Sequence, residues 1–232
     1  LTIVALGTLT SALAQNWALV DMEYILKNIP AYESATQQIE QSSKKWEKEA
    51  KKRGLDTETS VPLMIDQYLK KSSIQMFTST GVLSKSELHS RCEVKWENYS
   101  MKLQIESRVL GDLVINHILP AAKRYQTILL QNVQGVKQVF SASEAEKLSE
   151  QDILLIRSIE NHTSAITAKV NNMNKERARA NHIDNQRERA ITFHDYVVPL
   201  MEEIRQHVDD LEMVIDDQLW PLPKYRELLF IH

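Results

Sequence analysis

Apolar residues recur through most of this chain at intervals of three, four or seven, which is the spacing of one face of an α-helix. The first long stripe follows Ser84 and Glu87, whose spacing is that of a capping box at the start of a helix. Pro120 interrupts this stripe without ending it, so we predict one long helix with a kink at the proline. Its apolar members are Leu88, Cys92, Val94, Met101, Ile105, Val109, Leu113, Leu119, Ala122, Tyr125, Leu129, Val133 and Val136.

Two further stripes occupy the C-terminal half of the chain. One begins at Ser149 and Asp152 and has the three-four alternation of a coiled-coil seam. The other begins at a second capping-box pattern at Asn185, and Pro199 should bend it. Because only residues 181–184 separate them, we predict an antiparallel helical hairpin that packs on the kinked helix. The two stripes are Ile153, Ile156, Thr163, Ile166, Val170, Met173, Arg177 and Ala180, then Ala190, Phe193, Val197, Leu200, Ile204, Leu211, Ile215 and Leu219.

The remaining segments are shorter. Ser60 and Pro62 stand where an N-cap and a first-turn proline would, which predicts a single helix towards Phe77 that is broken at Gly81. An apolar run over 17–26 is typical of a short strand that leads into a polar helix. With only 5 Gly and 6 Pro in 232 residues, a fold rich in tight turns is disfavoured. We therefore predict an all-α fold in which a long kinked helix packs with a helical hairpin, plus a short N-terminal strand–helix segment.

Composition narrows the function classes. The chain is 43% hydrophobic and 25% charged, which is enough apolar material for a sizeable core. The formal net charge is only -3, and the sequence shows no concentrated run of basic residues of the kind that binds nucleic acids or anionic membranes. We therefore expect no nucleic-acid partner. The apolar run over 1–14 is too short to span a bilayer, and we expect no membrane span. Cys92 is the only cysteine, which excludes an internal disulfide and predicts a small buried thiol.

The residues that could carry chemistry form no recognisable site. The histidines show no H-x3-H or E-x-x-H pair that would place two ligands on one helical face. The neighbouring carboxylates of Asp216 and Asp217, and of Glu202 and Glu203, diverge on a helix. The tryptophans are interpreted as packing anchors, and the basic run 175–179 as a solvated face. We therefore predict no catalytic, cofactor-binding or metal-binding residue, and interpret as core or surface histidines His89, His117, His162, His182, His194 and His207.

The N-terminus has its own resemblances. Residues 1–14 end in Ala12-Leu13-Ala14, which is typical of the end of a signal peptide, and we predict a partial signal peptide here. The strings "VDMEYIL", "IPAYE" and "QQIEQSSKKW" follow in residues 15–45, and this segment resembles the start of the Skp/OmpH family of periplasmic chaperones. That resemblance implies an exported trimeric chaperone. The returning arm and the further strands of that family are not found downstream.

Residues 46–232 resemble a different family. "WEKEAKKRGL", "GVLSKSELHSR", "EVKWENYSMKLQIESRVLGDLVINHILPAAKRYQ", "NVQGVK", "EEIRQHVDDLE" and "DDQLWPLPKYRELLF" occur in this order, and they resemble the C-terminal domain of type III glutamine synthetases, the large form found in Bacteroidetes and cyanobacteria. The resemblance implies a parent ligase that joins glutamate and ammonia with ATP and Mg²⁺. It also implies a cytoplasmic dodecamer of two hexameric rings. The family's substrate, nucleotide and metal residues belong to domains that precede this region, so no cofactor is expected in this chain.

The two resemblances meet near Lys44–Trp46, which suggests a join, either a natural fusion or a chimeric reading frame. Three interpretations follow. The chain is a helical fragment of a type III glutamine synthetase with a structural and oligomerisation role and no active site of its own. Alternatively, it is an exported Skp/OmpH-like chaperone, or a helical interaction module. The first predicts a cytoplasmic protein and the signal peptide predicts the periplasm. A domain without its catalytic neighbours should also expose apolar surface and self-associate.

Overall fold

The computed structural model describes residues 30–55 and 57–224, and the chain divides into two compact units, 1–58 and 59–232. The described part of the first unit is helix α3 (Pro30–Lys52), which is followed by Gly54 with a positive φ of 70°. α3 runs without interruption through Lys44–Trp46, where the sequence suggested a join. The predicted signal peptide (1–14) and the strand-like run (17–26) lie outside the described residues.

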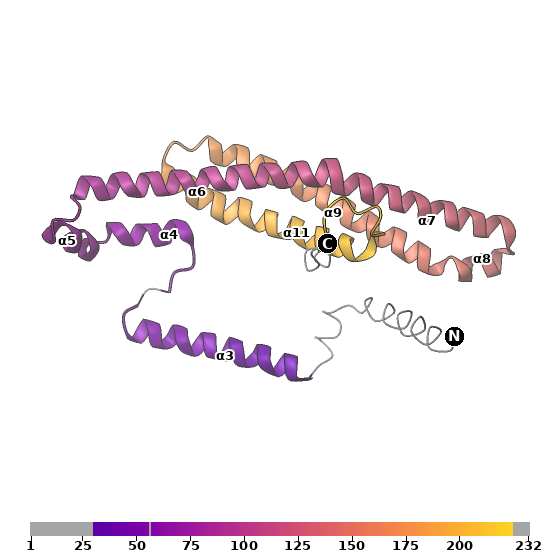
Figure 1. Cartoon of the computed structure of the whole chain (residues 1–232), viewed down its shortest axis with the longest axis horizontal. Coiled ribbons are helices and arrows are strands. Elements are labelled where there is room, and N and C mark those ends of the chain that lie inside the picture. Colours follow the sequence, from indigo (N-terminus) through magenta and orange to yellow (C-terminus); the bar gives the residue numbers. More distant parts are fainter. Residues whose placement is uncertain (1–29, 56, 225–232) are drawn as a thin grey trace, which may run out of the picture. The chain divides into compact units, whose positions relative to one another are not determined.

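The second unit is helical throughout its described part (Figure 1). The described residues of the chain contain no strand, which confirms the all-α prediction. In chain order its elements are α4 (Val61–Asp66), the 3-10 turn η2 (Gln67–Leu69), α5 (Lys71–Ser79), α6 (Lys85–Leu113), the π-helix η3 (Val114–Ile118), α7 (Leu119–Val139), α8 (Ala142–Leu148), α9 (Glu150–Asn181), α10 (Gln186–Thr192), the π-helix η4 (Phe193–Val197) and α11 (Val198–Val214).

The longest feature is the continuous rod formed by α6, η3 and α7, on the order of 80 Å at 1.5 Å per residue (Figure 1). It begins at the predicted capping box. The Glu87 N–H donates to Ser84 Oγ (3.2 Å), and the Ser84 N–H donates back to Glu87 Oε2 (2.7 Å). These bonds to Ser84 lower the pKa of Glu87. The rod continues past Pro120, as predicted.

Both prolines inside long helices follow a π-helix. Pro120 and Pro199 are each the second residue of the α-helix that succeeds η3 or η4. A proline ring clashes with the carbonyl four residues earlier, and here Asn116 and Asp195 hold those carbonyls inside the π segments. The wider π turn, marked by the bond from the Leu119 N–H to the Val114 carbonyl five residues back, accommodates the ring. The helices therefore change pitch at the prolines and do not end there.

The predicted hairpin is present. α9 and the helix made by α10, η4 and α11 pack side by side, and α7 also packs on α9 while α10 packs on α6 (Figure 1). The turn at 182–185 ends with Asn185, whose Oδ1 accepts the Glu188 N–H at 3.0 Å. The core is drawn from all three stripes, and its fully buried members include Val114, Ala122, Ile159, Ile166, Met173, Phe193, Val197, Ile204 and Leu211.

A smaller cluster joins α4 to α6 and α10. Trp96 is 2% exposed and its indole Nε1 donates to the Pro62 carbonyl at 3.0 Å. Cys92 packs beside it, which confirms the predicted buried thiol, and burial raises the pKa of that thiol. Trp96 and Trp220 are packing anchors as predicted. Trp46 is 63% exposed, so that prediction was wrong for this residue.

The single helix predicted from Ser60 to Phe77 was wrong. The chain forms α4, a 3-10 turn and α5, with extended backbone at Lys70 (ψ 145°) between them. The Ser73 hydroxyl donates to the Gln67 carbonyl at 2.7 Å and satisfies it at this break. Apolar spacing cannot detect one extended residue, because the stripe resumes almost in phase. Gly81, with φ 69°, follows the end of α5 as predicted.

The predicted core face of α6 was wrong in part. Val94, Met101, Ile105 and Val109 are each 50–57% exposed. The predicted Leu88 and Cys92 are buried, and the buried face of six residues is completed by Trp96, Ser100, Leu103 and Ser107. Two of these six are serines, and the Ser100 hydroxyl donates to the Trp96 carbonyl at 3.0 Å, so a polar residue is buried at no hydrogen-bonding cost. A search for apolar residues alone therefore placed Leu88 and Cys92 correctly but selected the opposite face from Val94 to Val109. It also missed α8, which begins at a capping box of Ser141 with Glu144.

Candidate functional site

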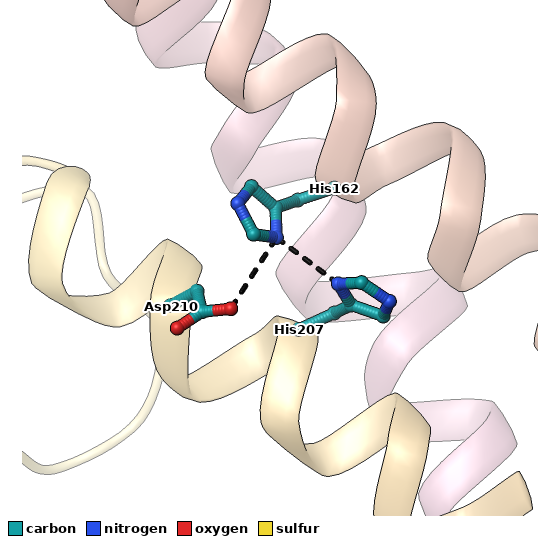
Figure 2. Close-up of side chains that lie close together, drawn as sticks. All are labelled: His162, His207 and Asp210. Atoms are coloured by element: carbon teal, nitrogen blue, oxygen red, sulfur yellow. Dashed lines mark hydrogen bonds and ion pairs between the residues drawn. The ribbon is translucent and has the colours of Figure 1, made fainter.

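The facing helices of the hairpin bring two histidines and an aspartate together (Figure 2). His162 lies on α9, and His207 and Asp210 lie on α11. The two Nδ1 atoms are 3.1 Å apart, and His162 Nδ1 lies 3.7 Å from Asp210 Oδ2. One possible ligand atom from each residue lies within 4.8 Å of those of the other two. We call this group the His–His–Asp cluster.

The local sequence explains the cluster's position. His207 and Asp210 are three residues apart, so both project from one side of α11. Ile204 and Val208 on α11 are buried in the core, as is Ile166 on α9. These apolar contacts fix the antiparallel register that places His162 opposite His207. The side chain of His162 is 23% exposed and that of Asp210 is 53% exposed, so the cluster lies at the solvent edge of the hairpin.

The electrostatic surroundings of His207 favour its neutral imidazole. Burial lowers the pKa of His207, and the positive charges of His162 and Lys169 lower it further, while Asp210 and Glu203 oppose them. Lys169 of α9 is itself ion-paired with Glu203 of α11, one turn from His207. Neutral imidazole is the form that accepts a hydrogen bond or binds a metal ion.

The distance between the two Nδ1 atoms limits the chemistry. Two nitrogens at 3.1 Å require either one N–H donor and one lone pair, or two lone pairs directed at a shared cation. The Asp210 carboxylate can accept a hydrogen bond from a protonated ring nitrogen or supply an anionic oxygen ligand to a cation. The cluster can therefore form a hydrogen-bonded triad or hold a cation.

Sequence reasoning missed this cluster. It placed His162 and His207 on separate turns and considered only H-x3-H and E-x-x-H pairs. His207-x-x-Asp210 has equivalent helical spacing and was the available signal. No sequence signal identified His162 as the third member, because it lies on the facing helix α9. His194 lies outside this cluster. Its Nδ1 lies 2.9 Å from Oδ1 of the next residue, Asp195.

A second polar group links α7 to α9. Lys123 Nζ donates to Glu160 Oε2 at 2.6 Å, and Gln126 Nε2 donates to the same oxygen at 3.1 Å. The hydrogen bond from Lys123, followed by that from Gln126, lowers the pKa of Glu160 to about 2. Lys123 and Glu160 border an open groove of about 430 Å³. Because these polar side chains already pair with one another, we interpret the group as a structural link between α7 and α9.

Two of the other charged residues considered from sequence, Asp217 and Arg179, have structural partners. Lys224 Nζ contacts Asp217 Oδ1 at 2.5 Å and donates to the Glu212 carbonyl at 2.8 Å. Arg179 lies over the Tyr196 ring, with its guanidinium carbon 4.3 Å from the ring centroid. Asp217, Arg179 and Glu203 are 45%, 52% and 50% exposed, so these predicted solvated charges lie at the surface and also have partners there.

The described residues of the second unit form an all-α domain built on a long rod and a hairpin. A family model described as the glutamine synthetase C-terminal domain matches residues 24–137. The chain is 45% identical over 207 residues to a glutamine synthetase of Bacteroides fragilis (strain YCH46), an alignment that covers 89% of this chain and 28% of the relative. Residues 24–137 thus match the glutamine synthetase C-terminal domain, and most of the chain is similar to part of a bacterial glutamine synthetase.

More distant relatives agree. A type-3 glutamine synthetase of Dictyostelium discoideum is 28% identical over 196 residues, covering 80% of this chain and 25% of the relative. A glutamine synthetase of Butyrivibrio fibrisolvens is 24% identical over 185 residues, covering 80% and 26%. The chain thus spans about a quarter of the length of the curated relatives it matches.

The family match also bears on the N-terminal segment. It begins at residue 24 and runs through the suggested join at Lys44–Trp46, so it includes much of the segment compared with Skp/OmpH chaperones. None of the helices described is both long and apolar enough to cross a bilayer.

Proposed function

We propose that this chain is the C-terminal scaffold domain of a type III glutamine synthetase, with a structural and oligomerisation role. The observation that carries this proposal is the family match together with the 45% identity to the Bacteroides fragilis relative. In this account, substrate, ATP and Mg²⁺ are bound by the parts of the enzyme beyond this chain, and the domain contributes packing surfaces. The whole enzyme is cytoplasmic and assembles as a dodecamer of two hexameric rings.

The N-terminal segment belongs to the synthetase in this proposal. The family match enters at residue 24 and α3 passes unbroken through the suggested join. Both observations favour a segment of synthetase origin over a chaperone start attached to a synthetase fragment.

A surface suited to packing lies on α6. The exposed side chains of Val94, Met101, Ile105 and Val109 are spaced by seven, four and four residues and so form one stripe, which we call the α6 outer stripe. It lies on the side of α6 opposite the buried residues Cys92 and Leu103. Apolar stripes of this kind on a folded domain mark contact surfaces. We assign the α6 outer stripe to contacts with the rest of the synthetase.

The isolated chain is expected to self-associate through this stripe. Replacing Met101 and Ile105 together by glutamate should shift the chain towards monomer, because two charges would be desolvated on association. Both side chains are at least half exposed, so the unfolding free energy should change by less than about 1 kcal/mol. Sedimentation velocity at micromolar concentration measures the change.

The control is the same pair of changes on another exposed surface, Leu148→Glu with Leu154→Glu. That double variant should sediment like the unmodified chain. A clean monomer for the unmodified chain, or equal dissociation by both double variants, would contradict the assignment of the stripe.

The proposed scaffold role is tested by exchange. In the Bacteroides fragilis relative, the C-terminal region would be removed, or replaced by this chain. We expect the truncated enzyme to lose its large assembly and the replaced enzyme to recover it, as measured by light scattering. Assembly that is unaffected by the truncation would show that the domain has no oligomerisation role.

A further inference from the structure

We propose that His162, His207 and Asp210 form a binding site for a divalent transition-metal ion of the zinc class, which cross-links α9 to α11 (Figure 2). The site lies outside the residues to which the synthetase resemblance assigns chemistry. It holds whether or not the scaffold role proposed above is correct.

The distances fit such an ion. Ligands held about 2.0–2.2 Å from Zn²⁺ in tetrahedral geometry are roughly 3.4 Å from one another. The Nδ1–Nδ1 distance of 3.1 Å lies just below this value, and the distance of 3.7 Å from His162 Nδ1 to Asp210 Oδ2 lies just above it. The third separation, between the ligand atoms of His207 and Asp210, is at most 4.8 Å, and the carboxylate of Asp210, whose side chain is 53% exposed, can rotate to shorten it. The histidines need no movement of their helices.

The donor set selects the class of metal. Two imidazoles and one carboxylate suit Zn²⁺, Ni²⁺ and Cu²⁺, whereas Mg²⁺ and Ca²⁺ prefer oxygen ligands throughout. Three protein ligands on Zn²⁺ leave a fourth position for water. Because Asp210 is at the solvent edge, that position faces outward and an ion can enter from solution.

The charges near the site are balanced. Asp210 supplies one negative charge to the ion, and Glu203 neutralises Lys169, the cation that acts on His207. Arg205 and Asp209 on α11 form a further exposed pair with 3.7 Å between Nε and Oδ2. An incoming dication therefore meets no uncompensated positive side chain among these groups.

The position of the ligands predicts a structural effect. His162 and His207 are 45 residues apart in sequence and belong to the two arms of the hairpin. An ion bound only when the arms are paired stabilises the folded state by mass action. Added zinc should therefore raise the thermal unfolding midpoint of the chain.

Isothermal titration calorimetry with ZnCl₂ tests the site on the complete, tag-free chain after treatment with a chelator. We expect one saturable zinc site per chain, at least roughly tenfold weaker binding in His207→Gln and in Asp210→Asn, and no saturable binding of MgCl₂. The rise in the unfolding midpoint with zinc should disappear in both variants.

Matched controls keep the test specific. Asp209→Asn makes the same change on the adjacent residue of α11, and His89→Gln removes an exposed histidine of α6. Both should bind zinc like the unmodified chain. Asp210 is exposed, so Asp210→Asn remains informative even if His207→Gln fails to fold. Absence of saturable zinc binding, or equal affinity in Asp210→Asn and Asp209→Asn, would overturn the proposal.

Discussion

Replacing Phe193 by alanine is expected to lower the free energy of unfolding by about 3–5 kcal/mol. Phe193 is the first residue of η4, it is fully buried, and it is the largest of the fully buried side chains in the described part of the chain. It packs in the main core, where α6, α9 and α11 supply the surrounding side chains. The π-helix fixes the backbone at this point, so the cavity left by the ring cannot close easily.

Urea unfolding followed by circular dichroism measures this loss. Phe140→Ala removes the same ring from a residue that is 46% exposed, and should cost much less. Phe193→Leu, which keeps most of the volume, should recover a large part of the stability. Equal losses for Phe193→Ala and Phe140→Ala would mean that the bundle core does not lie where the structure places it.

The second large effect is expected from Trp96→Ala, again about 3–5 kcal/mol. The indole fills the small cluster formed with Ile65, Cys92 and Ala190, and its N–H bonds the Pro62 carbonyl. Loss of the ring removes both the packing and the hydrogen bond that holds α4 to α6. We therefore expect α4 to lose protection from hydrogen exchange before the hairpin does.

Two further variants separate the contributions. Trp96→Phe keeps a ring but removes the donor, and should cost less than Trp96→Ala by about 1–3 kcal/mol. Trp46→Ala removes an indole that is 63% exposed and should change stability by less than about 1 kcal/mol. A Trp96→Ala protein whose α4 amides stay as protected as those of α9 would contradict the role given to this indole.

The rod and the hairpin could be predicted from sequence because each depends on local chemistry. The capping box at Ser84 and the N-cap at Asn185 mark the starts of α6 and α10, and the spacing from Ile166 to Met173 indicates the buried face of α9. The prolines were recognised as interruptions within continuous helices. The π-helices that precede the prolines allow each helix to continue past its proline. Apolar periodicity alone does not reveal the one extra residue in a π turn.

The remaining features depend on tertiary contacts. Which face of α6 is buried was decided by Trp96, Ser100 and Leu103, and a buried serine looks like a surface residue in an apolar pattern. The His–His–Asp cluster required the register between α9 and α11, which no local pattern contains. The Skp/OmpH comparison rested on short strings in a segment that the synthetase family match largely covers from residue 24.

This chain is proposed to be a scaffold whose chemistry belongs to the rest of a synthetase. Glutamine formation from glutamate, ammonia and ATP tests it most directly, measured for three proteins: this chain alone, the Bacteroides fragilis relative without its C-terminal region, and that truncated enzyme joined to this chain. We predict no activity for the chain alone, strongly reduced activity for the truncated enzyme, and recovery on joining. Glutamine formed by the chain alone, or full activity of the truncated enzyme, would contradict the account.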